Sequence, residues 1–222
     1  MTKDALRYIP LLLPFFQISN AQEVPVAEIS NDRIRTEIYL PDVENGYYQG
    51  TRFDRSGIMP VLEHENHSYF GKWFKKYDPK VHESVMGPVE EFSPLGYEEA
   101  KIGDSFVKIG VGVLIKQEEP KYNKFKTYEI HDAGEWKVKN SANQITFDHK
   151  LKEHRYSYEY TKKISLSPGK SEMAITHSLK NSGSQTIETE VYDHNFFLSI
   201  VSISALITLF GFPSRFLAKE RS

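Results

Sequence analysis

Hydrophobic and polar residues alternate with a period of two along most of residues 24–194, a pattern typical of half-exposed β-strands. The segment IRTEIYL (34–40) is a clear example, since Ile34, Ile38 and Leu40 fall on one side and charged residues on the other. Further strands are predicted at 106–115, 126–130, 135–139, 144–149, 156–166, 172–179 and 186–193, with turn-forming residues at 132–134, 140–143, 167–170 and 180–183. A spacing of roughly ten residues without a helical period predicts an all-β fold, an antiparallel sandwich or barrel.

Two segments depart from this alternation. Residues 106–115 are almost continuously apolar and predict one strand, in which Gly110 and Gly112 mark a bend or the close approach of another backbone. Residues 41–104 concentrate aromatic residues, histidines, glycines and carboxylates without a clear period. This second segment is either a binding surface carried by the β scaffold or a long structured loop covering one end of it.

The composition excludes several classes of protein. Hydrophobic residues make up 39% of the 222 residues and aromatic residues 13%, which excludes a disordered chain. The net charge of −2 gives no electrostatic reason to expect a nucleic-acid partner. The chain has no cysteine, so disulfides, thiolate metal sites and cysteine nucleophiles are excluded.

The first residues have the pattern of a secretory signal peptide over residues 1–21. Lys3 and Arg7 precede an apolar stretch from 8 to 18, and Ser19 and Ala21 occupy the small-residue positions before a cleavage site. Export, with a periplasmic location, is the expectation that follows. The alternative is a buried amphipathic helix, against which Pro10 and Pro14 argue.

Histidines and carboxylates in the irregular segment suggest candidate sites. His64 and His67 are possible metal ligands, but on one strand their odd spacing places them on opposite faces, so no metal site and no cofactor are predicted. Glu90 and Glu91 are candidate substrate-binding carboxylates. Because they are adjacent, a strand would direct one of them into a pocket and the other away from it, which does not suit glycosidic cleavage by a facing pair.

Trp73 is a candidate for stacking on a sugar ring, together with Tyr69 and Tyr77. Lysines at 72, 75, 76 and 80 are interleaved with this aromatic patch and are interpreted as its solvated rim. On the predicted strand 186–194, Tyr192 and His194 share a face, and His194 ends the polar face at a position suited to reach a groove.

Three stretches, GTRFDRSG (50–57), GPVEEF (87–92) and DHNFF (193–197), lie in a chain that resembles the galactose mutarotase-like (aldose 1-epimerase) superfamily, in particular uncharacterised exported members. The resemblance covers roughly residues 29–197 and otherwise rests on strand order. It implies an antiparallel supersandwich with a sugar-binding groove. It also implies that His194 is the acid that protonates the ring oxygen, while a glutamate acts as base.

The chain departs from the family in two ways. Met86-Gly87-Pro88 stands where the resemblance implies a histidine and an arginine, and Arg52 is the candidate substitute for that arginine. The family pattern stops at Phe197, before the region that supplies the base glutamate. The domain over residues 22–197 is therefore expected to be partial and catalytically incomplete.

Residues 195–214 carry no charge, in a chain that is 26% charged. The tail from 198 to 222 has three interpretations: a frameshifted continuation, a membrane anchor flanked by Arg215, Lys219 and Arg221, or a pair of buried core strands. A membrane contact through 195–214 follows from the second interpretation.

Three functions remain open from the sequence. The first is an epimerase-like enzyme acting on a small sugar or the end of a polysaccharide. The second is a non-catalytic carbohydrate-binding domain, and the third is a membrane-anchored β-domain without a sugar ligand.

Overall fold

The computed structural model of the protein describes residues 24–152, 154–198 and 217–218. The predicted signal peptide at 1–21 lies outside these residues, and so does the predicted tail at 198–222 except for Leu198 and a two-residue strand. Within the described part of the chain, no helix is long and apolar enough to cross a membrane.

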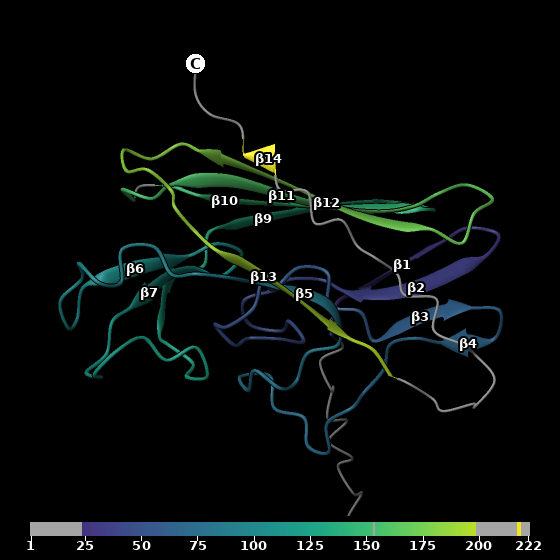
Figure 1. The fold of residues 1–222 in the computed structure, drawn as a ribbon, viewed down its shortest axis with the longest axis horizontal. Helices are drawn as coiled ribbons and strands as arrows, with labels where there is room; N and C mark the ends of the chain where they lie inside the picture. Colours follow the sequence, from purple (N-terminus) through teal and green to yellow (C-terminus); the bar gives the residue numbers. More distant parts are fainter. Residues whose placement is uncertain (1–23, 153, 199–216, 219–222) are drawn as a thin grey trace, which may run out of the picture.

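The described residues form β-strands in four hydrogen-bonded sheets and contain no helix, which confirms the all-β prediction (Figure 1). All strand pairs are antiparallel except β14 with β12. The first sheet has the order β1 (Val26–Ser30), β2 (Ile34–Tyr39), β3 (Val61–His64), β4 (His67–Ser68). The second has the order β14 (Leu217–Ala218), β12 (Met173–Asn181), β11 (Tyr158–Leu166), β10 (Gln144–Leu151), β9 (Glu135–Ser141). The smaller sheets are β13 (Val191–Phe196) with β5 (Gly87–Phe92), and β6 (Ser105–Lys108), β7 (Gly112–Ile115), β8 (Ile130–Asp132).

The five-stranded sheet forms one layer, and the three smaller sheets lie beneath it (Figure 1). Its buried inner residues alternate strictly with partly exposed ones along β10 and β11, as the period of two predicts. At one end they pack on β1 and β2 through residues such as Ile38, Phe147 and Ile164. At the other end they pack on β5, β6 and β7 through residues such as Phe92, Val107 and Tyr160.

The predicted strands at 34–40, 135–139, 144–149, 156–166 and 172–179 all correspond to observed strands, with small differences at their ends. Two predictions need correction. Of residues 126–130 only Ile130 belongs to a strand, and the strand expected at 186–193 begins at Val191 and continues to Phe196. The shift follows from β5, whose full length pairs with residues 191–196.

The prediction of one strand over 106–115 is wrong, because β6 and β7 form a hairpin there. Gly110 and Gly112 lie at the turn with φ of +75° and +132°, values that disfavour other residues. A Cβ at Gly112 would lie 2.2 Å from the backbone oxygen of Asp132, so the predicted close approach of another backbone is confirmed.

His64 and His67 are also placed differently from the prediction. They are direct cross-strand partners in the β3–β4 hairpin, so they lie on the same face and not on opposite faces. The turn between them, Glu65-Asn66, has φ of 51° and 62°, a two-residue hairpin turn that the sequence pattern did not reveal. No group of three or more possible metal ligands occurs in the described residues.

Glu65 holds a left-handed backbone conformation that glutamate disfavours and asparagine tolerates. We expect Glu65→Asn to raise the free energy of unfolding by about 0.5–1 kcal/mol. Glu65→Gln is the matched control, because it removes the charge and keeps the unfavourable conformation. Urea unfolding of the three proteins measures the effect. The same gain in the free energy of unfolding for Glu65→Asn and Glu65→Gln would contradict this explanation.

Candidate functional site

The paired strands β5 and β13 have one side toward the five-stranded sheet, here called the inner face, and an outer face directed away from it (Figure 1). Glu90 lies opposite Asp193, and Glu91 opposite Tyr192. Adjacent residues of a strand point to opposite sides. Glu90 therefore belongs to the inner face and Glu91 to the outer face, as the sequence predicted.

The outer face carries an ion pair between Glu91 and Arg52. The Nε of Arg52 donates a hydrogen bond of 2.8 Å to Glu91 Oε2, and both side chains are about nine-tenths buried, with exposures of 12% and 10%. The Nζ of Lys124 lies 3.8 Å from the same oxygen. Pairs shielded to this degree hold their geometry better than exposed pairs on the surface.

Aromatic rings continue the outer face beside this ion pair. His194 stacks on Phe196 with 3.7 Å between ring centroids, and Phe196 stacks on Trp73 at 5.2 Å. Phe53 meets both His194 and Phe196 edge-on, at 6.3 and 6.2 Å. The Arg52 guanidinium lies 4.5 Å from the centre of the Phe53 ring, which joins the ion pair to the aromatic stack.

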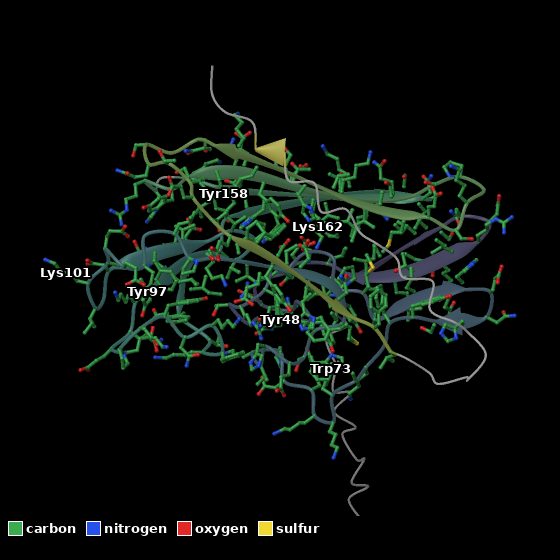
Figure 2. The ribbon with its side chains drawn as sticks, viewed as in Figure 1. Tyr48, Trp73, Tyr97, Lys101, Tyr158 and Lys162 are labelled. Atoms are coloured by element: carbon green, nitrogen blue, oxygen red, sulfur yellow. The ribbon has the colours of Figure 1, made fainter. Side chains whose placement is uncertain are left out.

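Trp73 combines a fixed position with an accessible surface. Its indole Nε1 donates a hydrogen bond of 2.9 Å to the backbone oxygen of Val85, while 43% of the residue stays exposed. Figure 2 shows Trp73 and Tyr48 on the side of β5 and β13 opposite the five-stranded sheet. Such a ring offers apolar contact area at a low cost in conformational entropy.

His194 is partly shielded among these groups. Burial lowers its pKa below the usual value, the charge of Arg52 lowers it further, and Glu91 opposes the change. Its Nδ1 atom is buried and makes no hydrogen bond with any described residue. The lowered pKa favours the uncharged imidazole at neutral pH.

Lys108 lies beneath the outer face and is fully buried. Its Nζ donates hydrogen bonds to the backbone oxygen of Arg52, at 2.7 Å, and to the hydroxyl of Tyr122, at 3.0 Å. Burial lowers the pKa of Lys108 to about 7, with Arg52 and Lys124 acting in the same direction and Glu91 against it. The pKa falls this far because the buried ammonium is hydrogen bonded only to neutral acceptors.

The inner face holds a different cluster. The Nζ of Lys162 donates hydrogen bonds to Glu90 and, at 3.0 Å, to the backbone oxygen of Ser56, and it lies 4.0 Å from Asp54. His177 is hydrogen bonded to the other oxygen of Glu90 at 2.9 Å. Figure 2 shows Lys162 directed from the five-stranded sheet into the space above β5 and β13.

Two carboxylates thus share one lysine in this cluster. Burial raises the pKa of Asp54, and the charge of Glu90 raises it further. Burial also acts to raise the pKa of Glu90, but Lys162 and His177 outweigh it, so the pKa is lowered. Glu90 is therefore the charged partner that ties β5 to the five-stranded sheet, through β11 and β12.

Four of the five predicted site residues belong to the outer face: Arg52, Trp73, Glu91 and His194. Glu90 does not, since it connects the two layers. His194 does not end a polar face, because Phe196 follows it on the same side. The ring of Tyr69 meets His67, and the ring of Tyr77 stacks on Tyr47.

The sequence reasoning missed Phe53, Lys108, Lys124 and Phe196 as parts of this site. Phe53 follows Arg52 in the stretch GTRFDRSG, and Phe196 lies two residues after His194 in DHNFF, so alternation would have placed Phe196 beside it. Lys108 lies in an otherwise apolar stretch, and a lone lysine in such a stretch could have indicated a buried charged group. Lys124 comes from a loop, and nothing in its local sequence marked it.

Comparison of the chain with protein-family models, with curated proteins and with solved structures gives no match.

Proposed function

We propose that the protein binds carbohydrate on the outer face of β5 and β13, without catalysing epimerisation. The proposal includes a galactose mutarotase-like supersandwich as the finer fold and export as its location, both of which rest on the sequence. The observation that carries the proposal is the meeting of an exposed, fixed indole with a shielded Arg52–Glu91 pair.

Sugars present both hydroxyl groups and apolar C–H faces, and the outer face has a complement for each. Trp73 and the partly exposed Phe125 provide aromatic surface, with exposures of 43% and 57%. Arg52 and Glu91 provide donors and an acceptor in a fixed arrangement, suited to hydroxyl groups. Binding sites of this kind combine a largely apolar lining with a few oriented polar groups.

Two features favour binding over catalysis. The lowered pKa of His194 favours the neutral imidazole at pH 7, which is a much weaker acid than imidazolium. Glu91 lies on the same face, but its carboxylate is held by Arg52 at 2.8 Å and faces Lys124 at 3.8 Å. Arg52 thus already occupies one of the two carboxylate oxygens of Glu91.

We expect Trp73→Ala to weaken saccharide binding by about tenfold or more, since aromatic anchors dominate such sites. The measurement is titration calorimetry with a panel of neutral and acidic oligosaccharides. Tyr156→Ala is the matched control, because Tyr156 also packs at the surface, against the core cluster beneath β6 and β7. The proposal would be contradicted if Trp73→Ala and Tyr156→Ala lost the same affinity for saccharide, or if the unaltered protein bound none.

The same preparations separate binding from enzymatic activity. Polarimetry on freshly dissolved α-galactose should show mutarotation at the rate of buffer alone. An acceleration that His194→Ala abolishes would show that the site is catalytic after all.

A further inference from the structure

We propose that the saccharide bound at the outer face is acidic, with a carboxylate of a uronic acid seated between Arg52 and Lys124. This inference rests on the proposed function and names the class of ligand. It follows from the balance of charge and from the unused hydrogen-bond donors at the site.

The charges at this site do not balance. Lys108 interacts electrostatically with two cations, Arg52 and Lys124, and with one carboxylate, Glu91. Burial and these neighbouring cations together give Lys108 a pKa of about 7. A ligand that brings a negative charge would relieve this repulsion, whereas a neutral sugar would not.

Arg52 has donors available for such a ligand. Its Nε is taken by Glu91, while within the described chain no acceptor receives a hydrogen bond from either terminal nitrogen. The guanidinium lies between the rings of Phe53 and Phe125, at 4.5 and 4.9 Å, so its plane is fixed. A fixed guanidinium with two free terminal nitrogens suits the two oxygens of a carboxylate.

Lys124 and the aromatic stack complete the site. The Lys124 side chain is 45% exposed, lies 3.8 Å from Glu91 and stands 5.6 Å from the Phe125 ring. Phe53 connects Arg52 to Phe196, on which Trp73 stacks. Two aromatic rings, Phe53 and Phe196, thus link the carboxylate position to the stacking surface of Trp73, a span suited to a short oligosaccharide.

The test compares trigalacturonate with its fully methyl-esterified form, which removes the charge and keeps the sugar framework. Calorimetry at pH 6.5 and one low ionic strength should show the acid binding at least tenfold more tightly than the ester. Lys124→Gln should reduce this ratio to a few-fold. Lys121→Gln is the matched control, an exposed lysine of the same loop, and should leave the ratio unchanged.

The outcomes separate this inference from the proposed function. Equal affinity for acid and ester would overturn the inference and leave carbohydrate binding in place. Binding of neither form, nor of the neutral panel, would contradict the proposed function and the inference together. An acid preference that survives Lys124→Gln unchanged would also overturn the inference, because the charge would then be recognised elsewhere.

Proton uptake offers a second measurement. The groups that face the Lys108 ammonium are Glu91, Arg52, Lys124 and the Tyr122 hydroxyl. A bound carboxylate raises the proton affinity of Lys108, so at pH 7.5 acid binding should take up a fraction of a proton, measured in two buffers of different ionisation enthalpy. Lys108→Met should abolish this uptake, and an unchanged uptake would assign the proton to another group.

Discussion

Replacing Lys162 with methionine is expected to lower the free energy of unfolding by about 3–5 kcal/mol. Lys162 is fully buried and is the cation shared by Glu90 and Asp54 between the two layers. Methionine has a similar volume, so the variant removes the charge with little change in packing. Glu90 and Asp54 would remain buried with only His177 as a possible counter-charge.

Lys163→Met is the matched control, since Lys163 lies next in β11 but faces away from the layer interface. Urea unfolding should show at most about 0.5 kcal/mol of change in that variant. Adding Glu90→Gln to Lys162→Met should recover part of the loss, because the pair is then neutralised together. If Lys162→Met lowered the free energy of unfolding no more than Lys163→Met does, this cluster would not stabilise the contact between the two layers.

Lys108→Met is expected to change how stability depends on pH. The folded pKa of Lys108 is about 7, well below the value of roughly 10.4 in an unfolded chain. Between these two values the unfolded state binds more protons than the folded state, so the stability of the unaltered protein rises with pH in that window. Below pH 7 the lysine is charged in both states, and its burial is then most costly.

The measurable quantity is the difference in unfolding free energy between the two proteins at pH 6 to 10. The unaltered protein should gain about 3–5 kcal/mol relative to Lys108→Met across this range. Other titrating groups, such as the buried tyrosines, are common to both proteins and cancel in the difference. A difference that does not vary with pH would mean that Lys108 stays protonated and that its charge is compensated.

The two buried lysines show what the sequence could and could not predict. Alternation along β11 places Lys162 on the inner side of its strand, among Tyr158, Tyr160 and Ile164, so a buried lysine was readable from the pattern. Its partners were not, because Asp54 and Glu90 lie 108 and 72 residues before Lys162 in the chain. Contacts of such long range depend on how the sheets pack and not on local sequence.

The same distinction holds for the site. The opposite directions of Glu90 and Glu91 followed from strand geometry alone, and so did the shared face of Tyr192 and His194. The β6–β7 hairpin could not be recognised, because its strands and turn are apolar apart from Ser105 and Lys108. Its turn conformation depends on two glycines, whose φ values the sequence does not specify.

The most direct test of carbohydrate binding uses the two tryptophans of the chain as internal reporters. Trp73 lies on the outer face, while Trp136 lies in β9 and stacks on His149 at 4.1 Å. In protein labelled with ¹⁵N at the indole nitrogens, NMR titration with trigalacturonate and with neutral galactotriose follows both signals in one sample. We predict a saturable shift of the Trp73 signal with an unchanged Trp136 signal, whereas an unmoved Trp73 signal at saturating saccharide would contradict carbohydrate binding at this face.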